Sequence, residues 1–508
     1  MPRPLKPFGS VSSGKMAARG NAKRWGQMPT RLQMHAKNNL GVIMQDQGPR
    51  GKVVRNDKLD LYDSYLDSTQ YDDLRPWDEC SRAEEYVPIR SRKPRVIYNL
   101  AQVLVNKVTS KLMGESVFPK FTVEDDPEDT EFFRTVMKAC SFRRNLLEPI
   151  RKCLGSGSSF VRYFLVDGSV IMEWANAKYC YPKFDAKGEL SEIEIKYVYE
   201  DVNDQDEKGE YRLKWYRLLM NTDSDVLFDN PEYKENVEPK FVEVERNDHA
   251  LGWVQGEWLR TTKHKFDPDG DSLFGKVLDF IDDLNYSLSQ SSQAVQYNQD
   301  PQLIVNGIDE EDLSMLIKSS TKAWNLGKEG KAEFVESSLK GIETAQATRD
   351  DMRTRMLEVV RCVLHDPEKI VGSAQSGAAL KLLHGPLVEL VDELRTILEP
   401  LLVNLLTKIA LTLLEMNARG EETILQAPAG YQPASLDLTV DWPEIFPLTL
   451  SDLLQKSQVA NTLSMARIIS KESLTRWMAP DIGIENIDEE LQKISVQPVD
   501  NPFGSFGG

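Results

Sequence analysis

The sequence contains few of the residues that hold metals or form disulfides. It has five histidines and five cysteines among 508 residues. No two histidines have His-x-x-x-His spacing, and no two cysteines have Cys-x-x-Cys spacing. Zinc sites and disulfide frameworks depend on such paired spacing. We therefore expect no bound metal, and reduced, mostly buried thiols at Cys80, Cys140, Cys153, Cys180 and Cys362.

Sequence signatures of catalysis are also missing. Gly270–Lys276 fits Gly-x4-Gly-Lys, but Val277 stands where a P-loop carries its magnesium-binding Ser or Thr. Gly155–Ser159 lacks that ending as well and leads into a predicted strand rather than a helix. Asp267–Asp271 begins like a calcium loop, yet the sixth and twelfth positions lack the required Gly and Glu. We expect turns at these places, no cofactor and no enzymatic activity.

No hydrophobic run is long and uncharged enough to be an ordinary membrane span. The most apolar region, residues 387–416, is interrupted by seven charged side chains. The basic N-terminus is not followed by the apolar stretch of a signal peptide. These features predict a soluble, intracellular protein without a membrane partner.

Positive charge is scarce overall and concentrated at the N-terminus. The net charge is −17, whereas proteins that grip nucleic acid build affinity from Lys and Arg. An acidic protein that handles DNA would repel it, as a duct would, but an acidic enzyme or scaffold has the same charge. Residues 1–58 are a basic arm whose only acids are Asp46 and Asp57. Such an arm docks on an acidic partner or on DNA, or it is a solvated terminus.

The hydrophobic pattern predicts helices first, then a sheet, then helices again. Helices are expected near 99–113, 129–138 and 145–154, and strands from 160 to 264, with Asp167-Gly168 as a hairpin turn. A long helix over 380–416, a strand at 436–440 and two helices within 449–477 follow. This order indicates an α+β protein.

Two amphipathic helices flank a small lysine-bearing insert in the middle of the chain. The expected ranges are 271–298 for the first helix, 299–341 for the insert and 342–365 for the second helix. Each helix has one apolar face, which includes Val277, Ile281, Leu284, Leu288, Met352 and Met356. Faces of this kind need other helices as partners. A closed ring of copies of the chain would supply them.

Four short segments resemble the tailed-bacteriophage portal proteins, which are head-to-tail connectors. They are Phe274–Asn285, Ser376–Lys381, Val440–Pro443 and Ile468–Leu474. The resemblance spans about residues 90–495 and rests mainly on the order of the elements. It implies a portal fold with a mixed α/β wing, a helical stem, a small α/β clip and a helical crown.

The resemblance also implies a division of the chain. The expected parts are the arm (1–58), wing (59–270), first stem helix (271–298), clip (299–341), second stem helix (342–365), tunnel loop (366–377), a long helix and strand returning to the wing (378–445), crown (446–497) and tail (498–508). Within the tunnel loop, residues expected to meet DNA are Lys369, Ile370, Val371, Gly372, Ser373 and Gln375. In the clip, those expected to dock a motor or adaptor are Lys318, Lys322, Lys328 and Lys331.

By the same resemblance the chain forms a ring of about twelve copies at one capsid vertex. Double-stranded DNA would pass through it without sequence specificity during packaging and ejection. The implied partners are the terminase large subunit, the head–tail adaptor, and the major capsid and scaffolding proteins. Assembly is expected in the host cytoplasm, and the final location in the virion. The alternatives are a capsid scaffold or tail adaptor that forms no channel, and an enzyme acting on nucleic acid with Gly270–Lys276 as a degraded nucleotide loop.

Overall fold

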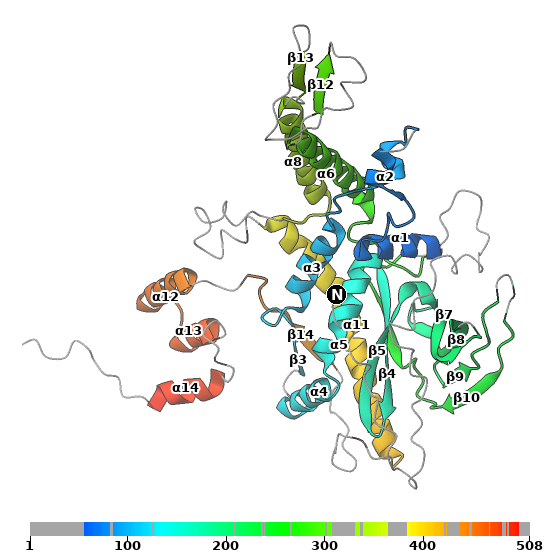
Figure 1. The fold of residues 1–508 in the computed structure, drawn as a ribbon. Coiled ribbons are helices and arrows are strands. Elements are labelled where there is room, and N and C mark those ends of the chain that lie inside the picture. The colour runs from blue at the N-terminus through cyan, green and yellow to red at the C-terminus, as the bar shows by residue number, and fades with distance from the viewer. Residues whose placement is uncertain are drawn as a thin grey trace, which may run out of the picture. The chain divides into compact units, whose positions relative to one another are not determined.

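The structure, a computed structural model, forms two compact units (Figure 1). Unit 1 comprises Met1–Cys362 and Val391–Trp442, and unit 2 comprises Val363–Leu390 and Pro443–Gly508. The described residues are 55–81, 85–123, 126–207, 209–234, 237, 239–264, 267–299, 302–306, 331–335, 339–363, 381, 384–420, 423, 437–446, 450–466, 468–479, 484 and 487–496.

Unit 1 begins with a chain of short elements. They are α1 (Arg55–Asp67), β1 (Arg75–Pro76), α2 (Trp77–Ser81), the 3-10 helix η3 (Ile89–Ser91) and β2 (Arg92–Lys93). Strands β1 and β2 pair in parallel. No long run of periodically spaced apolar residues marks these elements, so the sequence did not predict them.

The next elements are the predicted helices and an edge strand. They are α3 (Leu100–Met113), β3 (Lys120–Val123), α4 (Pro127–Ala139) and α5 (Phe142–Ser156). Asn99 caps α3 by accepting a hydrogen bond from the backbone N–H of Gln102. Asp126 caps α4 in the same way. The three predicted helices are therefore confirmed, each within a few residues of its expected ends.

Two antiparallel sheets follow. The three-stranded sheet has the order β11-β4-β5, and the five-stranded sheet has the order β10-β9-β8-β7-β6. Their strands are β4 (Ser158–Val166), β5 (Ser169–Asn176), β6 (Cys180–Phe184), β7 (Leu190–Gln205), β8 (Tyr211–Asn221), β9 (Ser224–Phe228), β10 (Glu243–Asp248) and β11 (Gly256–Arg260). A 3-10 turn, η4 (Ala177–Tyr179), links β5 to β6. The predicted hairpin turn is confirmed, since Asp167 and Gly168 both have positive φ.

The main core lies between these two sheets. Phe160 on β4, Ile195 on β7, Leu218 on β8 and Trp258 on β11 belong to one buried cluster, and each is at most 1% exposed. Leu59 of α1 joins the same cluster. The predicted burial of the cysteines is confirmed as well, because all five are free and buried.

The middle of the chain forms a helix pair with a small hairpin. Its elements are η5 (Gly275–Val277), α6 (Leu278–Gln299), β12 (Gln302–Asn306), β13 (Lys331–Val335) and α8 (Leu339–Val359). Strands β12 and β13 pair antiparallel. The first helix was expected to start at Asp271, but residues 271–277 are held in turns. The second was expected to reach His365, but Arg361 has a φ of 53° and ends the helical path.

Helix α11 (Gly385–Ala418) is the longest described helix and is followed by β14 (Leu438–Asp441), which pairs with β3. The sequence predicted a strand at 436–440 without naming its partner. By length and composition α11 is the one described helix that could cross a membrane. Polar contacts tie it to the three-stranded sheet. Lys408 forms an ion pair with Glu257 at 2.6 Å, and the Thr412 hydroxyl is 2.9 Å from that of Tyr163. These contacts are typical of a core helix in a globular protein.

Unit 2 contains the end of the chain. Its described helices include α12 (Leu450–Met465), α13 (Lys471–Met478) and α14 (Ile487–Val496). Ser470 caps α13 through the backbone N–H of Ser473. The two helices predicted within 449–477, joined near Ala466, are confirmed.

Candidate functional site

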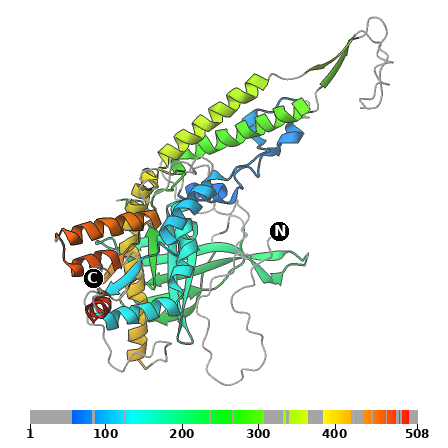
Figure 2. The ribbon, with the colours of Figure 1, turned by 90° about the vertical axis from the view of Figure 1, so that its left-hand side faces the viewer.

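The candidate site is the pair of helices α6 and α8, with the hairpin β12–β13 between them in sequence. The two helices lie side by side, and the hairpin continues from their far end (Figure 2). Because β12 and β13 run antiparallel, the chain goes out along α6 and returns along α8. The helix pair therefore carries β12 and β13 away from the sheets of unit 1 (Figure 2).

The apolar face near the start of α6 is covered by the chain itself. Val277, Ile281 and Leu284 are 0%, 1% and 6% exposed, and Met356 of α8 is 1% exposed. These four side chains were expected to contact a second copy of the chain, and here they are enclosed within the single chain. Helix α8 packs against α6 and η5.

We call residues 62–98 the strap, described at 62–81 and 85–98. The strap binds the polar face of α6 through hydrogen bonds. Asp282 accepts hydrogen bonds from the hydroxyls of Tyr65 and Tyr71, at 2.7 and 2.5 Å. Asn285 and Ser289, one turn apart and both 0% exposed, accept from the backbone N–H groups of Tyr98 and Val96. These buried polar groups are satisfied only because the strap supplies donors.

An aromatic cluster reinforces the polar contacts. Tyr71 and Trp77 of the strap pack with Tyr286 of α6, and all three are buried. The rings of Tyr71 and Tyr286 meet edge to face at 5.9 Å between centroids. The indole N–H of Trp77 donates to Gln293 at 2.9 Å. The contacts of the strap from Asp282 to Gln293 therefore extend over about three turns of α6.

Burial changes the acid–base behaviour of the strap tyrosines. The pKa of Tyr65 and that of Tyr71 are raised far above 10.0, first by burial and then by the hydrogen bond to Asp282. Both hydroxyls therefore remain protonated donors through the neutral pH range. Asp282 thus has two hydroxyl donors and no basic partner among its described contacts.

Some side chains of the pair are less covered. Leu288 of α6 and Met352 of α8 are half-buried, and Val295, toward the hairpin, is 39% exposed. Val359, the last residue of α8, lies at the near end of the pair and is 52% exposed. Arg349 of α8 donates to the Ser291 hydroxyl and links the two helices there. Lys331 is exposed at the start of β13. The surface available to a neighbour thus includes residues at both ends of the pair.

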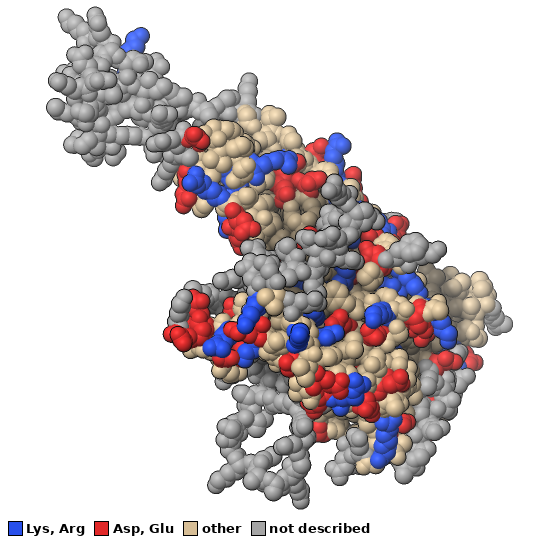
Figure 3. Space-filling model, turned by 90° about the vertical axis from the view of Figure 1, so that its right-hand side faces the viewer, with Lys and Arg blue, Asp and Glu red and all other residues tan. Residues whose placement is uncertain are grey.

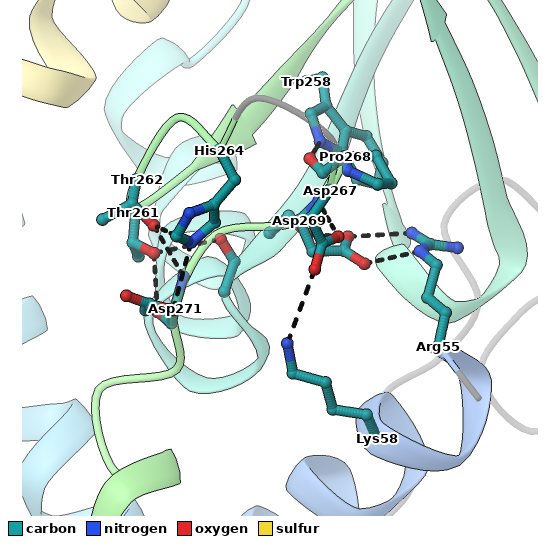
Figure 4. A network of polar contacts seen from close by, with 12 residues as sticks. Arg55, Lys58, Trp258, Thr261, Thr262, His264, Asp267, Pro268, Asp269 and Asp271 are labelled. Atoms are coloured by element: carbon teal, nitrogen blue, oxygen red, sulfur yellow. Dashed lines mark hydrogen bonds and ion pairs between the residues drawn. The ribbon is translucent and has the colours of Figure 1, made fainter. Parts of the chain in front are cut away.

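The root of α6 is fixed by a network of charged groups (Figure 4). Arg55 of α1 binds Asp269 in a bidentate ion pair, at 2.6 and 2.9 Å. Lys58 lies 3.9 Å from Asp267, and His264 lies 3.2 Å from Asp271. Asp267, Asp269 and Asp271, the acids of the segment expected to be a turn, each have a basic partner. The segment therefore connects α1, the sheets and the start of α6.

The segment that resembles a P-loop is part of the same joint. The backbone N–H of Asp271 donates to Thr262, that of Leu273 to Leu154, and that of Gly275 to Ser272. These donors are already used within the chain, whereas a phosphate cradle needs them free. Gly157, after α5, has a φ of 95°, and a side chain there would meet the carbonyl oxygen of Gly270. Both glycine-containing segments are close-packed turns, as predicted.

Several predicted site residues lie outside the described residues. These are Lys318, Lys322, Lys328, Lys369, Ile370, Val371, Gly372, Ser373 and Gln375. Within the described part of the chain, no group of three or more His, Cys, Asp or Glu residues could hold a metal ion. On the face drawn in Figure 3, acidic and basic side chains are interspersed.

Sequence reasoning missed the residues that receive the strap. Asp282, Asn285, Ser289, Gln293 and Gln296 recur at three- and four-residue spacing on one face of α6. Such a face is usually exposed to solvent, so its spacing alone does not indicate that another segment binds it. A possible signal was the tyrosine-rich segment 62–71, because tyrosines supply both ring surface and a donor.

Comparison with known proteins agrees with this architecture. A protein-family model described as "Phage portal protein, SPP1 Gp6-like" matches residues 82–497. The match covers most of the chain, and the chain therefore belongs to this family. It is a portal protein subunit of the capsid vertex. No curated protein shows a significant match to the sequence.

Solved structures include distant neighbours. A chain from "Neck of empty GTA particle computed with C6 symmetry" shares 11% identity at a TM-score of 0.41, covering 74% of this chain and 90% of that one. A chain from "Virion of native gene transfer agent (GTA) particle" has 11% identity and a TM-score of 0.38, covering 74% and 88%. A chain from the native particle's neck, computed with C12 symmetry, has 10% identity and a TM-score of 0.34, covering 74% and 90%.

Proposed function

We propose that copies of this chain assemble into a closed ring around an opening through which double-stranded DNA passes. The observation that carries the proposal is the α6–α8 pair, which leaves Val295, toward the hairpin, and Val359, at the end of α8, exposed. Exposed valines on paired helices do not stabilise a single chain, whereas contacts between copies in a ring would bury them.

In this proposal the parts have the roles expected of a portal. The sheets and α1–α5 are the wing, α6 and α8 the stem, β12–β13 the clip, and α12–α14 the crown. Leu288 and Met352, half-buried in the single chain, join Val295 and Val359 in the contact between copies. About twelve copies complete the ring.

The charge of the chain suits a duct. A net charge of −17 keeps attraction to phosphate low, so DNA would slide rather than bind. The segment 366–377, with Lys369, Ser373 and Gln375, is the proposed tunnel loop that touches the duplex. The chain itself acts as structure, and energy for packaging comes from a separate motor.

The clip is the proposed docking place for other proteins. Lys331, at the start of β13, together with Lys318, Lys322 and Lys328 in the same insert, would present positive charge at the end of the ring. The proposed partners there are the terminase large subunit during packaging and the head–tail adaptor afterwards. The major capsid and scaffolding proteins would surround the ring in the virion, after assembly in the host cytoplasm.

Electron microscopy of the purified full-length chain tests the ring. We expect closed rings with a central hole about as wide as a DNA duplex, some 20 Å. Compact particles without a hole would contradict the proposal and favour a scaffold or tail adaptor. ATP turnover by the purified chain, lost on Lys276→Ala, would favour the enzyme alternative.

Deletion of Lys369–Ser376 tests the tunnel loop. We expect rings to form normally, because the proposed contacts between copies lie elsewhere in the chain. Packaging or retention of DNA should fall. The measurement is the amount of DNA protected from nuclease in assembled particles. Loss of ring assembly would instead make this segment structural.

A further inference from the structure

The outer edge of the five-stranded sheet is open. Strand β10 lies at one end of the order β10-β9-β8-β7-β6, and β9 is its one strand neighbour among the described residues (Figure 1). The opposite edge strand, β6, contains Pro182 and an irregular register near Phe184. Proline and irregular register are two ways by which proteins protect sheet edges from pairing.

Strand β10 instead combines an open edge with exposed valines. Val242 and Val244 are 63% and 65% exposed, and Val237 in the preceding loop is 52% exposed. Five of the six residues of β10 are exposed, and Glu245 is half-buried. Exposed β-branched residues beside unpaired backbone groups favour the addition of another strand.

The charge of β10 indicates what kind of strand it would accept. The strand carries Glu243, Glu245 and Asp248 against a single basic residue, Arg246. Arg246 is paired with Glu243 at 2.8 Å and lies 3.9 Å from Asp248, so one basic residue faces three acids and the strand keeps a net negative charge that can act on a partner. An incoming strand that is apolar in its middle and basic at its flanks would complement this edge.

The basic arm of the same sequence contains such a segment. Residues 1–54 hold ten Lys and Arg and one Asp. Within them, residues 40–45 read Leu-Gly-Val-Ile-Met-Gln, with Lys37 before and Arg50 and Lys52 after. Val42 and Ile43 are β-branched, so the segment has the composition of a strand.

We propose that residues 40–45 of the arm add to β10 of the same chain as a sixth strand of this sheet. Main-chain hydrogen bonds would give the affinity, and Val244 would pack against Val42 or Ile43 across the strands. The flanking lysines and arginine would lie near Glu245 and Asp248. The inference concerns an edge of the sheet domain and does not depend on ring formation.

Disulfide trapping in the full-length chain tests the contact. The double variant Val42→Cys/Val244→Cys places one new thiol on each proposed partner, while the five native thiols are buried. Under mild oxidation we expect a disulfide between the new thiols. A faster-migrating monomer on a non-reducing gel would show pairing within a chain and support the proposal. Covalent multimers alone would show pairing between copies and would overturn it.

The matched control is Val42→Cys/Val202→Cys. Val202 is also an exposed valine of the five-stranded sheet, at 44%, but it lies on β7 rather than on the open edge. We expect the β10 pair to give about tenfold more disulfide than this control, as for a contact worth about 1.4 kcal/mol. Equal yields from the two pairs would overturn the proposal.

Neutral variants test the part played by charge. In the trapping variant, Glu245→Gln/Asp248→Asn should lower the disulfide yield severalfold, because opposite charges across strands stabilise pairing. Glu207→Gln/Glu210→Gln removes two acids from the β7–β8 turn and should leave the yield unchanged. An unchanged yield in the first variant would contradict the assignment of a basic strand to this edge.

Discussion

The two halves of α6 differ in what covers them, and the second half is richer in Ser and Gln than the first. In the first half, Ile281 and Leu284 are buried by the chain itself, and Asn285 and Ser289 are completely enclosed. In the second half, Val295 is 39% exposed. Amphipathic spacing shows that a helix has a face to bury, but not whether the same chain or another one buries it.

The strap encloses the polar groups of the first half. It supplies tyrosine hydroxyls and backbone N–H groups to Asp282, Asn285 and Ser289, and its contacts extend along the helix to Gln293 through Trp77 and to Gln296 through Arg95. Beyond that point α6 has α8 as its main partner. The first half is thus a rigid anchor in unit 1, and the second half is available to a neighbouring copy.

The largest expected effect comes from placing a charge in the anchored half. Ile281→Asp would put a carboxylate at a position that is 1% exposed and has no basic partner among its described contacts. We expect the free energy of unfolding to fall by more than about 4 kcal/mol, because an unpaired buried charge is very unfavourable. Thermal unfolding followed by circular dichroism measures this loss.

The matched change in the other half is Val295→Asp. This position is partly exposed, so the monomer should unfold within about 0.5 kcal/mol of the wild type. Ring assembly should nevertheless fail, since the charge would enter the proposed contact between copies. Native electrophoresis or light scattering separates the two results. Normal rings from Val295→Asp, or normal stability in Ile281→Asp, would remove the distinction between the halves.

A smaller loss is expected from removing the carboxylate that binds the strap. Asp282→Ala deletes the acceptor of two tyrosine hydroxyls and should cost about 2–3 kcal/mol in urea unfolding. Asp283→Ala is the control, because its partner Arg90 has a side chain that is 69% exposed. We expect less than about 1 kcal/mol there. Equal losses would show that the strap contacts contribute no more than a surface ion pair.

The smallest effect is the response of the strap to alkaline pH. The pKa of Tyr65 and that of Tyr71 are raised in the folded chain above their ordinary value of 10.0. Above pH 10.0 the unfolded chain loses these protons first, so the stability they contribute falls as pH rises toward their folded pKa values. It is fully present below pH 10.0.

Alkaline unfolding of Tyr65→Phe/Tyr71→Phe checks this dependence. The double variant should be less stable near neutral pH and should lose less stability between about pH 10 and pH 12 than the wild type. Tyrosinate absorbance in the same titration reports when the hydroxyls ionise. A parallel decline in both proteins would show that other groups determine the alkaline transition.

Much of the fold could be predicted from the sequence because its signals are local. Caps such as Asn99, the Asp167-Gly168 turn and the apolar spacing of α6 and α8 depend on residues close together in the chain. The strand β14 was predicted to return to the sheet region, and it pairs with β3. The absence of paired spacing predicted reduced cysteines, and because free cysteines are usually buried, burial was expected for all five.

The strap and the ends of the helix pair could not be predicted in the same way. Tyr65 and Asp282 are 217 positions apart, and neither has a local pattern that names its partner. Asp271 looked like the start of a helix, yet its segment is held in turns. The backbone N–H of Asp271 donates to Thr262, Gly270 packs against Gly157, and Asp269 forms an ion pair with Arg55. Tertiary contacts outweighed local helix preference there.

The sequence by itself determined the class of fold, the positions of most helices and strands, and the portal family, because these follow from periodicity, turn chemistry and the order of the elements. Only the tertiary structure decided which side chains of the helix pair are enclosed by the same chain and which are left for another. The physical reason is that burial is a property of neighbours in space, and residues 62–98 become neighbours of α6 only after the chain has folded.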